Sequence, residues 1–457
     1  MASPAFDPAN VWERLHAPEV ESLSRRFHAV RSDLFFLWWR ILGTRGSPVA
    51  ARAYLCRELL RAAGAPPPAL ESDRVDVVFV VQYPKPAGLG TLVPIEREML
   101  RRGARTHFWV LPGAQEALTA LRSQPQGRTR HIADLTGLAR RPTLDELRRA
   151  RTDSSTLLDA LASTGATPTW LRPLATALFL KFHTVTRQLN DLVRVWPRRI
   201  VFHNDFPTTV AAVMTAGPCS VSRLTLQHGI PSREQTPAMS PWYGVWGPYY
   251  ERLFSSRTTT SITVGCPRFD IYAELDGMQG VSGDSDKAIL ILGQPITPDL
   301  NPRVRCDIAQ LARSLLATLG GFRVILRLHP ADTTRAQAFR GIPGLRIESG
   351  GSRSLLDAVR EAEVVIATPT TGLVEAVLLG TPACAFCPTG LDPHVARALP
   401  PSIPRARNAD EVIAVFEEMK KHKAEWIAEQ RQVLCESAVS HVGSATKRVA
   451  DWLERRS

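Results

Sequence analysis

The stretch that decides the fold spans residues 364–386 and reads VVIATPTTGLVEAVLLGTPACAF. Residues 364–367 form an apolar run with the length of a buried strand. Residues 368–372 interrupt it with residue types that cap helices and form turns. Residues 373–379 resume with apolar side chains at helical spacing, a glycine then ends the helix, and residues 382–386 form a second apolar run. This order of strand, hydroxyl-rich turn, helix and strand is typical of a parallel α/β sheet.

The turn in this stretch is a candidate ligand-binding position. Open parallel sheets bind ligands at the carboxyl ends of their strands, where this turn lies. The amino terminus of the following helix offers N–H groups and partial positive charge, which suit a phosphate. Thr370, Thr371 and Gly372 are therefore candidate phosphate-binding residues, and Glu375 is within reach of a ribose hydroxyl. The alternative is an ordinary strand–helix unit capped by threonine.

The composition indicates a globular protein with more than one domain. The chain has 457 residues, of which 44% are hydrophobic and 22% charged, so we expect two domains with appendages. The net charge of +12 favours a polyanionic partner: nucleic acid, a nucleotide-linked substrate, an acidic polysaccharide or an anionic membrane surface. Composition does not choose among them, but the basic residues are dispersed and no block resembles a nucleic-acid-binding tail.

The sequence predicts a cytoplasmic protein. Residues 1–30 lack the apolar core of a signal peptide, and no segment reaches the roughly 18 apolar residues of a membrane span. Seven dispersed cysteines fit a reducing compartment. Cys384 and Cys387 have CxxC spacing, but they end an apolar strand without a second pair. We therefore expect buried small residues there, not a redox or metal site.

The chain divides into four segments. We expect a helical N-terminal region, two Rossmann-like α/β domains with parallel sheets, and C-terminal helices that pack back across both domains, over residues 1–70, 71–280, 281–405 and 406–457. The breaker GAPPP marks the first boundary, and a polar, glycine-rich linker marks the second. Between the first strands and the second half of the first domain, residues 113–195 are predicted to be mainly helical.

One helical face in the N-terminal region is strongly aromatic. Phe35, Trp38 and Trp39 share this face, beside several arginines. We expect the face to pack on the main body. The alternative is peripheral contact with the inner face of the cell membrane, because aromatic rings beside arginine can lie on a membrane surface.

Polar residues recur at the predicted carboxyl ends of strands in both domains. They are His203, Asp205, Gln227, His228, Arg268 and Asp270 in the first domain, and Arg327, His329, Thr370 and Thr371 in the second. Each histidine taken alone is better explained by a structural hydrogen bond than by a catalytic role. Because the pattern repeats at several strand ends, we expect these side chains to converge on one shared cleft.

Two further motifs carry less weight. Gly88-x-Gly90 is half of a dinucleotide fingerprint, since valine stands at position 93, and the loop can instead hold an acceptor. Asp284-Ser285-Asp286 has the DxD spacing of metal-dependent sugar transferases, but it precedes a strand instead of ending one. We therefore expect no metal site there.

Four motifs stand in an order that resembles a known group of enzymes. They are His228-Gly229, the run VGCPRFD that ends at Asp270, Leu328-His329-Pro330, and the run TTGLVEA that begins at Thr370. The chain resembles the bacterial surface-polysaccharide transferases with a GT-B fold, a group that includes capsule-synthesis, polysialyl and CDP-glycerol glycerophosphotransferase families. The resemblance covers about residues 200–390.

The resemblance implies roles for the two domains and for particular residues. The first domain would bind a glycan or lipid-linked acceptor, and the second a nucleotide-sugar donor. His329 would contact the donor phosphate, the hydroxyls of Thr370 and Thr371 would also hold phosphate, and Glu375 would reach the ribose. Threonine stands here where serine is frequent. Residues 367–370 also differ from the Asp-Tyr-Ser-Ser turn of the polyglycerol-phosphate members, which weakens a glycerophosphate assignment.

The predicted reaction is a single displacement at the anomeric carbon. Asp205 or His228 would remove the acceptor proton, while Arg327, His329 and the helix terminus stabilise the leaving phosphate. Arg268 is a further candidate donor-binding residue, and neither a metal nor a cofactor is expected. The alternatives are a CDP-polyol phosphotransferase, a nucleotide-sugar epimerase and a non-catalytic assembly partner.

Overall fold

The computed structural model describes most of the chain from residue 75 onward. Described are residues 14, 15, 20, 23, 27, 30, 31, 33, 34 and 37, and residues 75–455 except 83–87, 124–129, 139–141, 165–170, 205–206, 233–234, 236–237, 257, 276–287, 295–301, 331, 333–335, 350–352, 390 and 392. The predictions for Phe35, Trp38, Trp39, Asp205 and the Asp284-Ser285-Asp286 motif lie outside the described residues.

The first half of the chain forms a sheet in which, within the described residues, seven strands pair in parallel in the order β3-β2-β1-β4-β5-β6-β7. Its strands are β1 (Val77–Val81), β2 (Thr106–Val110), β3 (Arg130–Asp134), β4 (Arg199–Phe202), β5 (Ser222–Leu226), β6 (Trp242–Val245) and β7 (Thr260–Thr263). The sequence of β1, VVFVV, is buried at every position. Such a run is what a central parallel strand covered on both faces requires.

The second half forms a separate sheet, also parallel among the described strands, in the order β10-β9-β8-β11-β12-β13. Its strands are β8 (Ala288–Leu292), β9 (Arg323–Arg327), β10 (Arg346–Glu348), β11 (Ala362–Ala367), β12 (Ala383–Phe386) and β13 (Arg405–Ala406). The predicted strand–turn–helix–strand stretch lies here as β11, α14 and β12, with β11 and β12 hydrogen-bonded neighbours.

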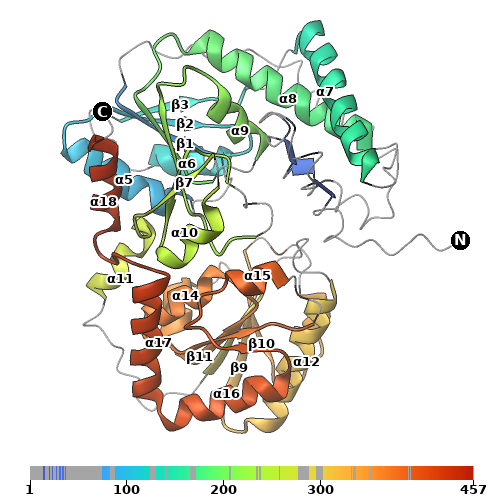
Figure 1. The fold of residues 1–457 in the computed structure, drawn as a ribbon. Helices are drawn as coiled ribbons and strands as arrows, with labels where there is room; N and C mark the ends of the chain where they lie inside the picture. The colour runs from blue at the N-terminus through green and yellow to red at the C-terminus, as the bar shows by residue number, and fades with distance from the viewer. Residues whose placement is uncertain are drawn as a thin grey trace, which may run out of the picture.

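Helices connect the strands and cover the sheets (Figure 1). The first half contains α5 (Leu89–Arg101), α6 (Gln115–Ser123), α7 (Leu144–Ser163), α8 (Leu171–Leu192), α9 (Thr208–Thr215), α10 (Pro248–Phe254), the 3₁₀ turn η3 (Pro267–Phe269) and α11 (Asp270–Glu274). The second half contains α12 (Pro302–Thr318), η4 (Gln337–Phe339), α13 (Leu355–Arg360), α14 (Thr371–Leu378), α15 (Pro393–Ala398), α16 (Ala409–Lys421) and α17 (Lys423–Ser437), and the chain ends with α18 (Ala445–Arg455).

The last two helices contact different halves of the molecule. Helix α17 packs on α14 beside the second sheet, whereas α18 returns to the first half and packs on α5 (Figure 1). Arg102, which follows α5, places Nη1 2.8 Å from carboxylate oxygens of both Asp451 and Glu454 in α18. The chain therefore crosses from one half to the other a second time near its end.

The buried core is continuous between the two halves. Tyr243, Trp246 and Phe269 come from the first half, and they share one cluster of buried side chains with Leu290 and Leu373 of the second. Burying side chains of this size contributes roughly 1.5–3 kcal/mol each. The contact between the halves is therefore an apolar interface as well as the wall of a cleft.

The described residues of 113–195 are mainly helical, as expected, because they form α6, α7 and α8. The sequence did not reveal one strand there, β3, at the edge of the first sheet. Its sequence, RHIAD, lacks the apolar run of a buried strand, and its described side chains are half-buried or exposed. An edge strand pairs on one side only and tolerates such residues, so hydrophobic patterning does not reveal it.

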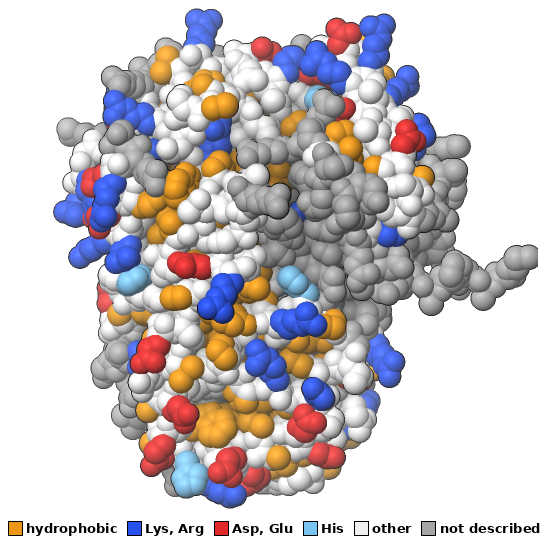
Figure 2. Space-filling model, in the orientation of Figure 1, with side chains coloured by type: hydrophobic (Ala, Val, Ile, Leu, Met, Phe, Trp, Pro, Cys, Tyr) orange, Lys and Arg blue, Asp and Glu red, His pale blue; other side chains and the backbone are white. Residues whose placement is uncertain are grey.

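Among the helices that the structure describes, none combines the length and the apolar content needed to cross a membrane. On the face shown in Figure 2, lysine and arginine side chains are spread over both halves and do not gather in one patch. This distribution agrees with the dispersed basic residues of the sequence.

Candidate active site

A cleft of about 560 Å³ lies between the carboxyl ends of the two sheets. Both halves line it, and eight of the nine predicted site residues are among its lining residues: His228, Arg268, Arg327, His329, Thr370, Thr371, Gly372 and Glu375. The ninth, Asp205, is not among the described residues. The cleft is large enough for a ligand of cofactor or nucleotide size.

The turn after β11 forms one wall of the cleft. Thr370 is the N-cap residue of α14, with extended backbone, but its side chain makes no capping hydrogen bond. This observation argues against the alternative that the threonine serves only as a helix cap. A Cβ atom on Gly372 would lie 2.6 Å from Leu292 Cδ1, so glycine allows the first turn of α14 to approach β8 closely.

Two arginines form the neighbouring wall at the end of β9. Arg327, only 6% exposed, donates from Nη2 to the Arg353 backbone carbonyl at 2.6 Å. Arg353 places Nε 3.1 Å from Glu348 Oε2, and Arg327 Nη1 lies 3.8 Å from the same oxygen. Burial lowers the pKa of Arg327, but a guanidinium remains charged at neutral pH. Arg353 also pairs with Glu361, and Arg346 also pairs with Glu348. Three arginines therefore face two carboxylates, and this wall keeps a net positive charge.

His329 lies beside this wall and follows β9 after one intervening residue, Leu328. Its backbone carbonyl accepts a hydrogen bond from the Asp332 N–H at 2.8 Å, which closes a turn, and Pro330 follows. The side chain is half-buried and lines the cleft together with Arg327, Thr370 and Thr371. An imidazole here is placed to donate to an anion held in the cleft.

An ion pair crosses the cleft between the two halves. Arg268 Nη2, beyond β7 of the first sheet, lies 3.1 Å from Glu375 Oε1 in α14 of the second. Burial raises the pKa of Glu375, although Arg268 acts to lower it. Burial also acts to lower the pKa of Arg268, but Glu375 and other neighbours outweigh it, and the pKa rises. The predicted ribose-binding carboxylate is thus held against a predicted donor-binding arginine.

A buried histidine, His203, meets a half-buried one, His228, behind the first-sheet wall. His228 Nδ1 lies 3.1 Å from His203 Nε2, and the rings cross edge to face with centroids 4.4 Å apart. Burial lowers the pKa of His203 well below its ordinary value, and it lowers the pKa of His228 to about 4, with Arg268 acting in the same direction on both. Both imidazoles are therefore neutral at pH 7.

His203 is the functional candidate to which sequence reasoning assigned no role. The sequence showed it as one of several polar residues at strand ends. Its partner His228 is 25 positions away along the chain. The available signal was its place directly after β4, next to β5 in the sheet, because neighbouring parallel strands bring their carboxyl ends together.

The loop that carries His228 is held rigidly. The Gln227 side chain accepts from the Trp246 backbone N–H at 3.0 Å and donates to the Gly229 carbonyl at 2.9 Å. The Trp246 indole N–H also donates to the Gln227 carbonyl at 3.0 Å. Gly229 comes close to the second half, since a Cβ atom there would lie 3.1 Å from Thr371 Oγ1.

The prediction of convergence is wrong for three residues, His203, Gln227 and Asp270, which do not line the cleft. Asp270 contacts the last helix instead. Its two carboxylate oxygens accept hydrogen bonds from the backbone N–H groups of Ala445 and Thr446, at 3.0 and 2.8 Å. These groups lie at the amino terminus of α18, where a carboxylate is stabilising. The turn η3 places Arg268 at the cleft and Asp270 against the last helix.

Cys384 and Cys387, the pair with CxxC spacing, are both free cysteines. Burial raises the pKa of Cys384 to about 12 and that of Cys387 to about 11, so both are thiols at neutral pH. Within the described residues, no group of three or more His, Cys, Asp or Glu side chains is arranged to hold a metal ion.

Comparisons with known proteins identify the fold. No protein-family model and no curated protein matches the chain. The UDP-GlcNAc 2-epimerase from Neisseria meningitidis, bound to UDP-GlcNAc, is 13% identical with a TM-score of 0.53, over 83% of this chain and 100% of that one. The UDP-GlcNAc 2-epimerase from Methanocaldococcus jannaschii, in complex with UDP-GlcNAc and UDP, is 13% identical with a TM-score of 0.50, over 83% and 99%.

The glycotransferase of kitacinnamycin is 14% identical, with a TM-score of 0.50 over 84% of this chain and 100% of that one. At these identities the likeness concerns the fold alone. It confirms the predicted class, an α/β protein with two Rossmann-like parallel sheets that face one cleft in the GT-B manner.

Proposed function

We propose that this protein is a glycosyltransferase that moves a sugar from a nucleotide-activated donor to a hydroxyl group of an acceptor. The observation that carries the proposal is the convergence, in one cleft, of cationic and hydroxyl side chains from the second sheet with a neutral histidine from the first. A transferase of this kind needs both: one side to hold a charged leaving group and the other to activate a nucleophile.

The second half would bind the donor. Arg327, His329 and Arg353 face the cleft beside the amino terminus of α14, where Thr370 and Thr371 add hydroxyl groups. Backbone N–H groups at a helix terminus and arginine side chains are well suited to phosphate oxygens. We assign the donor phosphates to this position, with the ribose toward Glu375. The bonds these groups make strengthen as negative charge develops on the leaving phosphate.

The first half would bind the acceptor and supply the base. In the displacement, the acceptor oxygen bonds to the anomeric carbon while the bond from that carbon to the phosphate oxygen breaks. The acceptor proton passes to His228, which is neutral in this cleft and so able to receive it. Asp205 is the other candidate base. The electron pair of the broken bond stays on the phosphate, which Arg327 and His329 hold.

The acceptor class belongs to the same proposal. The order of the four motifs resembles that of surface-polysaccharide transferases, and we assign the protein to capsule or related polysaccharide biosynthesis at the cytoplasmic side of the membrane. A glycan or lipid-linked acceptor would then enter beside His228 and the loop of Gly88 and Gly90.

A nucleotide-sugar epimerase is the second candidate, favoured by one specific observation. Two of the structures with the same fold are UDP-GlcNAc 2-epimerases bound to UDP-GlcNAc. An epimerase changes its sugar without an acceptor, which gives a direct distinction between the two candidates.

The experiment begins with binding. Thermal-shift measurements with UDP, CDP, GDP and CMP would select the nucleotide, because a ligand that binds only the folded state raises the melting temperature. The matching labelled nucleotide sugar is then incubated with and without a glycan acceptor. Acceptor-dependent transfer of label supports the transferase, whereas an altered sugar in the absence of acceptor establishes the epimerase. Failure of every nucleotide to bind would overturn both assignments.

A further inference from the structure

We propose that His203 is a positioning residue that fixes the tautomer of His228, so that His228 Nε2 carries the lone pair that receives the acceptor proton. The inference rests on the proposed function in taking His228 as the base. The inference goes beyond the proposed function because it assigns a role to a second, buried histidine and a defined direction to the hydrogen bond between the two rings.

The first support is the geometry of the pair. The distance of 3.1 Å between His228 Nδ1 and His203 Nε2 is that of a hydrogen bond, in which one nitrogen donates and the other accepts. His203 is 5% exposed and lies behind His228, which itself lines the cleft. When one ring nitrogen of a neutral imidazole makes a hydrogen bond, that bond determines which of the two nitrogens carries the proton.

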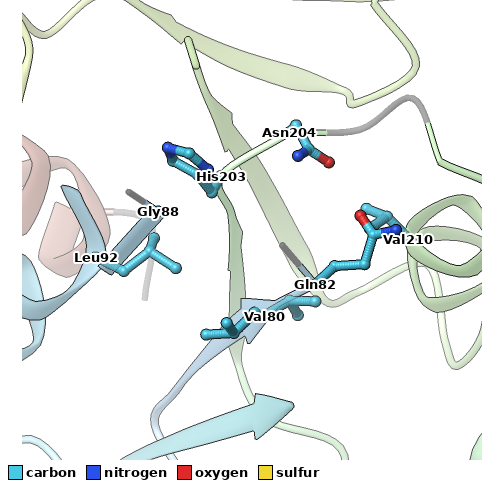
Figure 3. A pocket seen from close by; sticks show the side chains of 8 residues that line it. Val80, Gln82, Gly88, Leu92, His203, Asn204 and Val210 are labelled. Atoms are coloured by element: carbon cyan, nitrogen blue, oxygen red, sulfur yellow. The ribbon is translucent and has the colours of Figure 1, made fainter. Parts of the chain in front are cut away.

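The second support is a small pocket behind His203 (Figure 3). It has about 10 Å³ of room for the centre of a water molecule, which is about enough for one. His203, Gly88 and Leu92 lie on one side of it, and the amides of Asn204 and Gln82 lie on the other (Figure 3). Within the described residues, Asn204 Oδ1 and Gln82 Oε1 are buried without a hydrogen-bond partner.

These two oxygens favour a proton on His203 Nδ1. Both are buried acceptors that lack a donor among the described residues, which is costly. A proton on His203 Nδ1 supplies a donor. His203 then donates a hydrogen bond to a water molecule in the pocket, and that water molecule donates to the oxygens. His203 Nε2 is then unprotonated and accepts from His228 Nδ1–H. His228 Nε2 is left as the unprotonated nitrogen.

Gly88 is part of the same arrangement. A Cβ atom at this position would lie 3.0 Å from His203 Nδ1, closer than ordinary side-chain contacts allow. Glycine thus leaves room for the imidazole beside the first turn of α5. This close approach accounts for the first glycine of the Gly88-x-Gly90 motif, which the sequence offered as half of a dinucleotide fingerprint.

In the proton transfer that follows, only the proton of the acceptor hydroxyl moves. His228 Nε2 accepts the proton of the acceptor hydroxyl, and the new imidazolium keeps donating from Nδ1 to His203 Nε2. The hydrogen bond to His203 therefore strengthens as the positive charge forms. No proton needs to leave His203 during the reaction.

The test uses three variants of the full chain. His203→Leu removes the hydrogen bond, His203→Gln keeps a polar atom near the position of Nε2, and the exposed His131→Leu removes one ring of another histidine pair, with centroids 4.8 Å apart. We expect His203→Leu to lower kcat by about tenfold or more with the donor KM unchanged. His203→Gln should recover part of the loss, and His131→Leu should behave as wild type.

The pH profile adds a readout that packing alone would not move. Without an acceptor for Nδ1–H, the His228 imidazolium loses stabilisation, so the acid limb of kcat/KM should shift to lower pH in His203→Leu. If the acid limb is unchanged while kcat and the melting temperature fall together, the role of His203 is merely structural and the proposal is overturned.

Nitrogen-15 NMR of the histidine rings tests the tautomer without any turnover. In the wild-type protein, His228 should carry its proton on Nδ1, and in His203→Leu it should revert to a mixture dominated by the Nε2 form. A wild-type His228 that is protonated on Nε2 would refute the inference directly. Because this measurement needs no substrate, failure of the proposed transferase activity is distinguishable from failure of the positioning role.

Discussion

Arg268 and Glu375 join the two halves of the molecule through an ion pair in which Arg268 Nη2 lies 3.1 Å from Glu375 Oε1. The arginine follows the last strand of the first sheet, and the glutamate belongs to the helix after the central turn of the second. Their side chains are 22% and 12% exposed, so the pair lies largely away from water. It ties the relative position of the two halves to the residues that we propose bind the donor.

A double-mutant cycle on this pair measures that connection. We expect Arg268→Met and Glu375→Gln each to lower the free energy of unfolding by about 2 kcal/mol or more, because each leaves a shielded polar partner uncompensated. The double variant should cost clearly less than the sum. Urea unfolding gives the three values.

The exposed pair of Arg148 and Asp145 is the matched control. Its atoms are also 3.1 Å apart, but the side chains are 76% and 69% exposed. Exposed pairs contribute about 1 kcal/mol or less. If the losses in free energy of unfolding at Arg268 and Glu375 are additive and as small as those at the control pair, the two residues do not act together.

His329→Ala should lower turnover by about one to two orders of magnitude. A charge-assisted hydrogen bond to the leaving phosphate is worth roughly 1.5–3 kcal/mol, and about 1.4 kcal/mol corresponds to a factor of ten in rate. The fold should be spared, because the backbone carbonyl of His329 closes the turn at this position and remains in the variant. Activity per molecule and melting temperature are measured together.

His329→Gln is the conservative companion, since it keeps a donor and should retain part of the activity. The assignment of His329 to phosphate binding fails if His329→Ala lowers the melting temperature sharply while each folded molecule stays fully active. In that case the ring would be a structural cap of β9.

Gly229→Ala should weaken nucleotide binding several-fold with little change in stability. The added Cβ atom would lie 3.1 Å from Thr371 Oγ1, so the threonine must shift at the proposed phosphate position. Gly320→Ala is the control, because nothing lies within 4 Å of a Cβ atom there. Calorimetric titration with the selected nucleotide provides the comparison, and equal affinity in all three proteins would exclude this contact from the binding site.

The stability of the fold should decline as the pH falls from about 6.5 toward 4. Burial lowers the pKa of His203 well below its ordinary value and lowers the pKa of His228 to about 4, whereas an unfolded chain titrates histidine near 6.5. Below that pH the unfolded state binds protons that the folded state excludes, so the free energy of unfolding decreases. Above it, these two groups contribute no pH dependence.

Replacing both histidines by glutamine should flatten this decline, as measured by urea unfolding at pH 7, 6 and 5. A double variant that loses stability as steeply as the wild-type protein would show that the acid sensitivity arises from other groups.

The sequence predicted the local elements around the site because their signals are local. Apolar runs indicated β1, β8 and β9, and the hydroxyl-rich turn within residues 364–386 indicated where β11 gives way to α14. In parallel sheets the carboxyl ends of strands share one edge. Polar residues directly after strands could therefore be predicted to meet, and the structure brings eight of the nine predicted site residues to one cleft. Their roles in binding and catalysis stay predictions.

Only the tertiary structure decided which of these side chains touch. His203 and His228 are paired because β4 and β5 are neighbours, and Asp270 serves α18 because the last helix returns to the first half. The pairing of Arg268 with Glu375 depends on how two separate sheets face each other. Periodicity and residue type record what each segment buries, and they carry no information on which distant segment will lie against it. That choice is made by packing over the whole chain, so the sequence determined the parts of the cleft and the fold determined the contacts between them.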